Sequence, residues 1–231
     1  MTYPLILLSH RRREFLDGTL ASIREHLTGC SEVTIVDDSG DAEHRAWLAA
    51  QGHHVAPVAP ANAGYLTAMS VVFAVAREAC DRLGVDYALL WEEDFRLNAN
   101  LDAADMARIL DANPRLAQLN LQRQAVYKIE RRFGYMMSHR RRGYGLKVNV
   151  TNGISWVSRL RPFTTNPGMI RRAVLDHEWP SREESDLVRG HAEPAMSLRL
   201  EVAGWTFGWF GRWDTPHAEH VGMAMKSGTG Y

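Results

Sequence analysis

The first 98 residues alternate short apolar runs with longer segments of helical periodicity, and this alternation constrains the fold more than any other feature. The apolar runs are typical of buried strands, which we expect at residues 3–8, 32–38, 53–58 and 86–91. The segments between them carry apolar side chains at helical spacing, at residues 14–27, 41–50 and 64–82. Such alternation predicts an α/β fold with a mostly parallel central sheet flanked by helices.

The second half of the chain is less regular. Helices are expected at residues 101–110, 168–175 and 194–204, and strands at residues 115–122 and 154–158. Residues 123–150 are basic and weakly periodic, which predicts a long loop. No internal repeat or linker interrupts the chain, so we expect one domain over residues 1–231.

Charge and cysteine content exclude several classes of protein. Lysine plus arginine and aspartate plus glutamate each number 27, which argues against a protein that works by general attraction to nucleic acid or anionic membrane. Cys30 and Cys80 are too few for a disulfide framework or a thiolate metal site. The N-terminal apolar run is too short for a signal peptide or a membrane span, so we expect a cytoplasmic protein without integral membrane association.

Polar side chains follow the predicted strands of the first half. In parallel α/β sheets, ligands bind beyond the carboxyl ends of the strands. The residues expected there are Ser9, Asp37, Asp38, Asn62 and the acidic cluster Glu92, Glu93 and Asp94. The cluster has two interpretations: a metal site, because carboxylates are the ligands that hard divalent cations prefer, or a solvated turn.

Pro194 and Gly204 bracket the helix expected near the C-terminus. Glu193 is then expected at its N-cap, where the helix dipole stabilises a carboxylate. Such a carboxylate is either a catalytic base or a plain stabilising acid.

Five stretches, in this order, resemble the nucleotide-sugar-dependent glycosyltransferases of the GT-A fold, particularly those of family 2. They read SHRR, VTIVDDSG, NAGYLTAMS, LLWEEDF and AEPAMSLRLEVAGW. The resemblance covers most of the chain and is looser between about residues 123 and 163. It implies a single Rossmann-like GT-A domain in which residues 1–98 bind the nucleotide sugar and residues 99–231 bind the acceptor and supply the C-terminal tail.

The resemblance also implies roles for individual residues. The donor nucleotide would be held by Ser9, Arg11, Asp37, Asp38, Asn62, Gly64, Glu92 and Glu93. Asp37 and Asp38 have the alternative of capping the turn at Ser39-Gly40. Asn166 and Trp156 would border the donor or acceptor sugar.

The acidic motif of the family is Asp-x-Asp, which binds a divalent cation. Here Glu92 replaces the first aspartate and Asp94 keeps the last, so the resemblance implies Asp94 as a ligand of Mn²⁺ or Mg²⁺. His220 is the second expected ligand, with His217 as its rival. Glu193 is the expected catalytic base of an inverting enzyme, with Asp186 and Glu184 as rivals.

The resemblance therefore implies a metal-dependent, inverting, hexosyltransferase-like glycosyltransferase. It would move a sugar from a UDP- or GDP-linked donor to a hydroxyl of a protein, a glycan, a small molecule or a modified DNA base. The alternatives are a sugar-phosphate nucleotidyltransferase and a non-catalytic nucleotide-sugar-binding protein.

Overall fold

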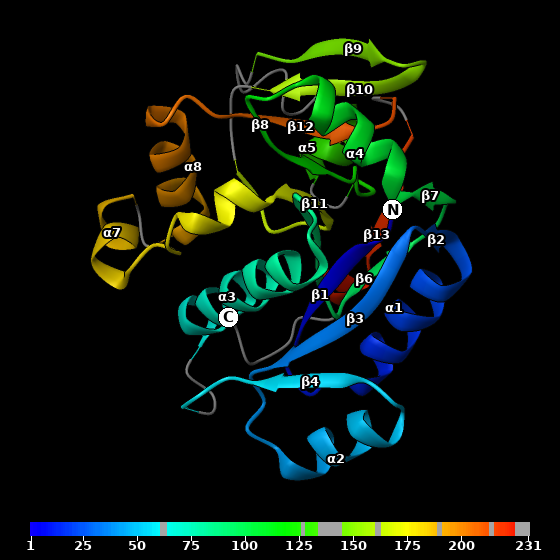
Figure 1. The fold of residues 1–231 in the computed structure, drawn as a ribbon, viewed down its shortest axis with the longest axis vertical. Coiled ribbons are helices and arrows are strands. Elements are labelled where there is room, and N and C mark those ends of the chain that lie inside the picture. The colour runs from blue at the N-terminus through cyan, green and yellow to red at the C-terminus, as the bar shows by residue number, and fades with distance from the viewer. Residues whose placement is uncertain are drawn as a thin grey trace.

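One large sheet organises the molecule (Figure 1). The structure, a computed structural model, describes residues 1–60, 64–125, 128–133, 145–159, 163–188, 191–212 and 215–224. Within them, nine strands lie in the order β4 (His54–Pro57), β3 (Cys30–Asp37), β1 (Tyr3–Ser9), β5 (Tyr87–Glu92), β11 (Gly168–Arg171), β8 (Leu116–Asn120), β12 (Thr206–Phe210), β10 (Ile154–Arg159) and β9 (Lys147–Thr151).

The sheet is mostly parallel, as the sequence predicts. Strands β4, β3, β1 and β5 pair in parallel. Strand β11 runs antiparallel to both β5 and β8, and β10 runs antiparallel to both β12 and β9. All other strands of this sheet therefore point in one direction, and their carboxyl ends meet at one edge.

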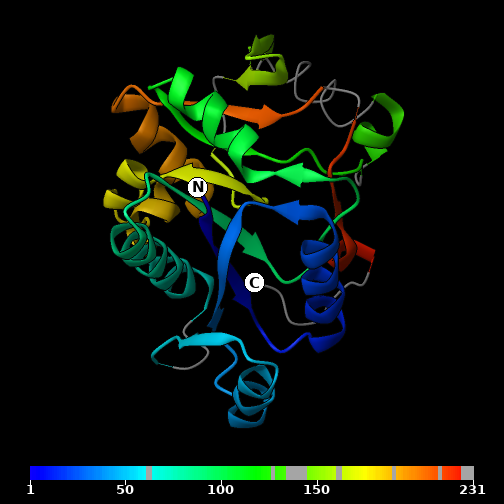
Figure 2. The same ribbon diagram turned by 45° about the vertical axis from the view of Figure 1, so that its right-hand side comes forward.

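Helices cover both faces of the parallel part. Helices α1 (Arg13–His26) and α3 (Tyr65–Leu83) lie on opposite sides of β1 and β3, as two views show (Figures 1 and 2). The central strand β1 is wholly buried between them, and Leu5, Ile6 and Leu7 are 0% exposed. The remaining helical segments are α2 (Ala42–Ala50), α4 (Ala103–Ala112), α5 (Lys128–Phe133), η1 (Arg172–Asp176), α7 (Arg182–Leu187), α8 (Ala192–Val202) and η2 (Val221–Ala224).

Two small sheets complete the fold. Strand β6 (Phe95–Leu97) pairs antiparallel with β13 (Ala218–His220), and β2 (Leu27–Thr28) pairs in parallel with β7 (Leu101–Asp102). The β6–β13 pair brings the C-terminal part of the chain back to the acidic cluster at the end of β5.

Four of the sequence predictions need correction. The prediction of a helix at residues 168–175 is wrong, because Gly168–Arg171 form β11 and only residues 172–176 of this region are helical. A Cβ at Gly168 would lie 2.6 Å from the Cα of Asn120, so this glycine allows β11 to fit closely against β8. The helix expected from residue 194 begins at Ala192 with His191 at its N-cap, which places Glu193 in the first turn.

The other two corrections concern residues 101–110 and 123–150. The first two residues of the helix expected at 101–110 form β7, and α4 runs from Ala103 to Ala112. The loop expected at residues 123–150 contains α5 and most of β9, and its residues 126–127 and 134–144 lie outside the described part of the chain.

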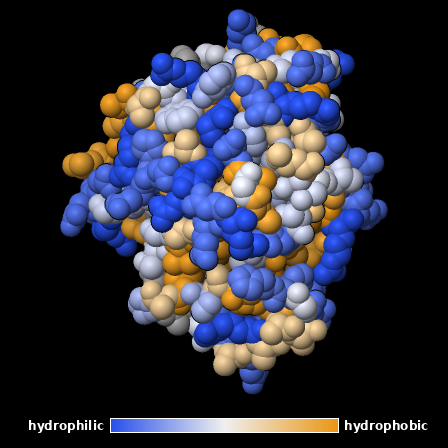
Figure 3. Space-filling model, viewed as in Figure 1, coloured by the Kyte–Doolittle hydropathy of each residue, from blue (hydrophilic) through white to orange (hydrophobic). Residues whose placement is uncertain are grey.

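Exposed apolar side chains gather over α7 and α8. Leu187, Leu198 and Val202 are 87%, 50% and 83% exposed, and hydrophobic atoms gather at this side of the molecule in Figure 3. None of the described helices is long and apolar enough to cross a lipid bilayer.

Candidate functional site

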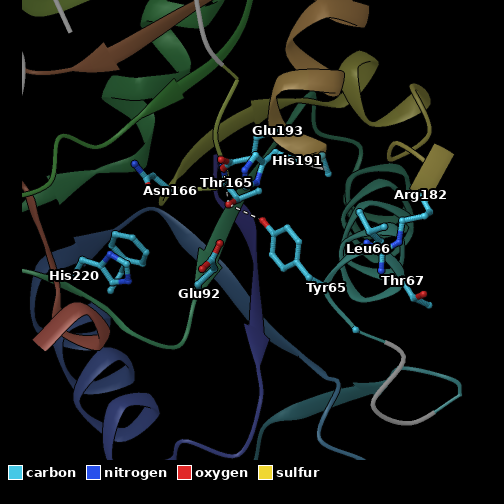
Figure 4. A pocket seen from close by; sticks show the side chains of 13 residues that line it. Tyr65, Leu66, Thr67, Glu92, Thr165, Asn166, Arg182, His191, Glu193 and His220 are labelled. Carbon is cyan, nitrogen blue, oxygen red and sulfur yellow. Dashed lines mark hydrogen bonds between the residues drawn. The ribbon is translucent and has the colours of Figure 1, made fainter. Parts of the chain in front are cut away.

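A cavity of about 860 Å³ opens at the carboxyl end of β5. Its walls come from the start of α3, the end of β5, the segment before β11, the start of α8 and strand β13. The polar residues that line it include Tyr65, Glu92, Thr165, Asn166, Glu193 and His220 (Figure 4). Segments far apart in the sequence therefore converge on the place where a parallel sheet binds ligands.

Glu193 is held rigidly in the wall of this cavity. Its Oε1 accepts hydrogen bonds from the Thr165 backbone N–H (2.7 Å), the Thr165 hydroxyl (2.9 Å) and the Thr164 hydroxyl (3.1 Å). The threonine segment is itself fixed by β8, since the Gln118 side-chain amide bonds both the N–H and the C=O of Thr164. The carboxylate is thus oriented before any ligand binds.

Thr165 connects the two glutamates of the cavity. Its hydroxyl accepts a hydrogen bond from the Tyr65 hydroxyl (2.8 Å), and it also hydrogen-bonds Glu92. Burial and the neighbouring charge of Asp94 raise the pKa of Glu92 to about 8, and Glu193 acts in the same direction. These effects favour the protonated form of Glu92, which can donate a hydrogen bond.

Asp94 and His220 form a pair beside Glu92. The Oδ2 of Asp94 lies 3.3 Å from His220 Nε2 and accepts a hydrogen bond from Arg12 Nη1 at 2.9 Å. Burial acts to raise the pKa of Asp94, but the hydrogen bond from His220 and the charge of Arg12 outweigh it, so the pKa is lowered. Asp94 is thus an ionised carboxylate at neutral pH.

The Asp94–His220 pair fits the needs of a hard divalent cation. Asp94 Oδ1 is buried and has no hydrogen-bond partner among the described residues. Among the described residues, no group of three or more His, Cys, Asp or Glu side chains forms a metal-ligand set. Mn²⁺ and Mg²⁺ need only one or two protein ligands when phosphate oxygens and waters complete the coordination, so this pair could be the protein part of such a site.

Comparison with solved structures connects this architecture to known proteins. S. aureus TarS (residues 1–349) superposes with a TM-score of 0.57 at 14% identity, over 96% of this chain and 60% of that one. The second neighbour is the mannosyltransferase PcManGT from Pyrobaculum calidifontis in complex with GDP-Man and Mn²⁺. It superposes with a TM-score of 0.53 at 13% identity, over 98% of this chain and 58% of that one. The chain has the GT-A fold.

A third neighbour is a synthetase. The CMP:2-keto-3-deoxy-manno-octonic acid synthetase complexed with CTP gives a TM-score of 0.52 at 14% identity, over 91% of this chain and 90% of that one. This chain spans about 60% of the TarS and PcManGT chains but nearly all of the synthetase. No family model and no curated protein matches the sequence.

In this GT-A structure, the three adjacent acids have three different environments. Glu92 faces the cavity, and Asp94 meets Arg12 and His220. Glu93 is only 1% exposed and points back toward β1. It accepts hydrogen bonds from the Ser9 hydroxyl (2.7 Å), the His10 N–H (2.9 Å) and Arg12 Nε (2.6 Å).

The residues expected to bind the nucleotide lie at the ends of β1 and β3. Ser9, Asp37 and Asp38 are buried, and Asp37 Oδ1 accepts the Ser39 N–H at 3.0 Å, as a turn-capping aspartate does. Asp38 Oδ2 lies 3.8 Å from His10 Nδ1. Arg11 is half exposed, with a φ of 69° and its Nε 3.5 Å from Asp41. None of the four lines the described cavity.

The other expected donor contacts are placed differently. Gly64 lines the cavity and caps α3 with a φ of 84°, which explains the need for glycine. Asn62 lies outside the described residues. Asn166 lines the cavity, but Trp156 is 5% exposed within β10, where its Nε1 donates to Thr151 Oγ1.

The alternative candidates for the base and the second metal ligand lie away from the cavity. Asp186 is exposed on α7, and Glu184 caps the same helix through Ser181 and pairs with Arg199. His217 packs edge-on against Phe210, where burial lowers the pKa of its imidazole. Of the rival pairs, only Glu193 and His220 face the cavity.

Arg12 and Thr165 belong to the site although the sequence analysis assigned them no role. Arg12 lies within the SHRR stretch, but nothing local distinguishes it from Arg11 or Arg13. Thr165 directly precedes Asn166, which the sequence analysis expected beside the sugar, so Asn166 was the available signal.

Proposed function

We propose that the chain transfers a sugar from a UDP- or GDP-linked donor to an acceptor hydroxyl, with inversion and with the help of Mn²⁺ or Mg²⁺. The observation that carries this proposal is a fixed carboxylate, Glu193, in the same cavity as His220, the partner of Asp94. The complexes of TarS with UDP-GlcNAc and of PcManGT with GDP-Man and Mn²⁺ support the choice of donor and cation.

Glu193 would act as the general base. Its described hydrogen bonds all go to Oε1, and none of the described residues bonds Oε2. Oε2 is therefore available to accept the proton of an acceptor hydroxyl as that oxygen attacks the anomeric carbon. Direct attack needs no covalent intermediate, so the anomeric configuration inverts.

Asp94 and His220 would hold the cation, through a carboxylate oxygen and Nε2. When bound there, a divalent cation neutralises the negative charge of the departing diphosphate. Arg12 already contacts Asp94 Oδ2 and would contribute a second positive charge at the same position.

The remaining residues would bind the donor. Protonated Glu92 would donate a hydrogen bond to a donor oxygen, and Asn166 would border the sugar. The nucleotide site would be formed or supported by Ser9, Arg11, Asp37, Asp38, Asn62, Gly64 and Glu93. The role of Trp156 beside the donor or acceptor sugar rests on the family resemblance alone. In this arrangement residues 1–98 bind the donor and residues 99–231 bind the acceptor, which is a protein, a glycan, a small molecule or a modified DNA base.

Turnover by base variants tests the proposal. Glu193→Gln should lose at least about 100-fold in kcat while still binding donor, because general-base catalysis contributes about 10²–10⁴-fold. Glu184→Gln and Asp186→Asn serve as matched controls and should retain wild-type turnover. Unchanged kcat in Glu193→Gln, or a product of retained anomeric configuration by NMR, would contradict the mechanism. Donor binding without turnover would favour a non-catalytic binding protein.

A nucleotidyltransferase is the second candidate, because the CMP:2-keto-3-deoxy-manno-octonic acid synthetase matches this chain over 90% of its own length. Against it, the SHRRREF stretch after β1 lacks the glycine of a phosphate-binding loop. Release of pyrophosphate from a nucleoside triphosphate and a free or phosphorylated sugar would identify this activity.

A further inference from the structure

The segment that carries His220 lies outside the large sheet. Strand β13 pairs only with the three-residue strand β6 among the described strands, and His220 stands opposite Phe95 in that register. A short edge pair of this kind is a weak support, so other contacts must fix the place of the imidazole.

Gln124 supplies such contacts. Its Oε1 accepts the His220 backbone N–H at 2.8 Å, and its Nε2 lies 3.4 Å from the His220 backbone oxygen. Because the backbone N–H only donates and the C=O only accepts, these two groups also fix the orientation of the amide. The backbone N–H of Gln124 donates to the Ala218 oxygen at 3.0 Å, so the same residue secures both ends of β13.

The segment around Gln124 is itself anchored. Arg123 forms a bridge with Ala218 and a two-pronged ion pair with Glu130 of α5, with both N–O distances 3.0 Å. Both side chains are largely buried, at 9% and 2% exposure of their residues. A buried, two-pronged guanidinium–carboxylate pair has strict geometry, so it holds the backbone next to Gln124 in place.

With its backbone held by Gln124, the His220 ring has little freedom. One face stacks on Phe95 at a centroid distance of 4.2 Å and an interplanar angle of 15°. The ring then directs Nε2 toward Asp94 Oδ2 at 3.3 Å. We propose that Gln124 is a positioning residue that holds His220 where it can share a divalent cation with Asp94.

This inference rests on the proposed function, in which Asp94 and His220 bind the cation. Partners that orient a metal-binding histidine typically change metal affinity by 10- to 100-fold when they are removed. Gln124 acts through the backbone of the ligand, so we expect an effect near the lower end of that range, about tenfold.

The test measures Mn²⁺ binding to the full chain in the presence of UDP or GDP, by the electron paramagnetic resonance signal of free Mn²⁺. Gln124→Met keeps the size of the side chain and removes both hydrogen bonds, and it should weaken Mn²⁺ binding about tenfold. Gln122→Met is the matched control, because the Gln122 side chain donates to the Phe210 and Arg212 oxygens and its hydrogen bonds among the described residues do not include His220. Binding by this control should stay within about twofold of wild type.

A double-mutant cycle shows whether the effect passes through His220. In a His220→Ala background, Gln124→Met should cause no further loss of Mn²⁺ affinity. An additional tenfold loss there, an equal loss in Gln122→Met, or wild-type affinity in Gln124→Met would each overturn the positioning role.

A second measurement needs no metal. The Phe95 ring shifts the resonances of the stacked His220 ring protons, and Gln124→Met should reduce this ring-current shift in a histidine-labelled sample. An unchanged shift would overturn the positioning role. Absence of Mn²⁺ binding in wild type would instead refute the proposed function, whereas loss in Asp94→Ala with none in Gln124→Met would refute only the role of Gln124.

Discussion

Replacing Glu92 with glutamine should remove a pH dependence of stability that this structure predicts. Burial and the charge of Asp94 raise the pKa of Glu92 from 4.5 to about 8 in the folded protein. Between about pH 5 and 8 the folded protein therefore keeps a proton that the unfolded chain has released. The free energy of unfolding must then fall as the pH rises through this window.

The size of this pH dependence follows from the pKa shift of Glu92. At about 1.4 kcal/mol per pH unit, the full displacement of the pKa sets an upper bound of about 5 kcal/mol. The carboxyl group faces an open cavity, where water screens the neighbouring charges, so we expect about 2 kcal/mol. Glutamine resembles the protonated form of Glu92. Between pH 5 and pH 9 the free energy of unfolding of Glu92→Gln should therefore fall by about 2 kcal/mol less than that of wild type.

Urea unfolding at one-unit pH steps measures this difference. Glu184→Gln is the control, because the hydrogen bond from Arg199 lowers the pKa of Glu184 from 4.5 and confines its contribution to more acidic pH. This control should run parallel to wild type from pH 5 to pH 9. Parallel curves for wild type and Glu92→Gln would show that folding does not raise the pKa of Glu92 and would refute the reasoning.

Three further substitutions have defined outcomes. Thr165→Val removes the hydroxyl that donates to Glu193 and accepts from Tyr65. It should lower kcat for donor turnover about tenfold, and Thr165→Ser, which keeps the hydroxyl, should restore kcat. Gly222→Ala would place a Cβ against Asp94 Oδ2, and calorimetry should show weaker Mn²⁺ binding by a folded protein. Gly168→Ala would place a Cβ 2.6 Å from two backbone atoms of β8, and should lower the free energy of unfolding by about 2 kcal/mol in urea.

The first half of the fold was predictable because its signals are local. Strand β1 is a continuous apolar run with all seven residues buried, β3 is rich in β-branched residues, and each connecting helix has its own periodicity. The order of these elements then places Ser9, Asp37 and the acidic cluster at one edge of the sheet.

The second half was harder because its strands depend on distant partners. The sequence GMIRRAVL has the spacing of a helix, yet Gly168–Arg171 lie between β5 and β8 and complete the sheet. Strand β12 at residues 206–210 was not expected at all, although it pairs with both β8 and β10. Tertiary pairing overrides weak local preference in both cases.

In the candidate site, too, local features were predictable and contacts between distant residues were not. The sequence singled out Glu92, Glu93 and Asp94, but their spacing does not show which one faces the cavity and which one supports β1. The hydrogen bonds of Glu93 to Ser9 and His10 bring together residues more than 80 positions apart, and no local pattern encodes such a contact.

Calorimetric titration of UDP, GDP and their sugar conjugates, first with Mn²⁺ and then with EDTA, tests the central claim most directly. The account predicts binding in the micromolar range that requires the metal and disappears in Asp94→Ala, with the preferred nucleotide identifying the donor. Donor binding that is unchanged by EDTA and by Asp94→Ala would contradict a metal-diphosphate site at Asp94 and His220.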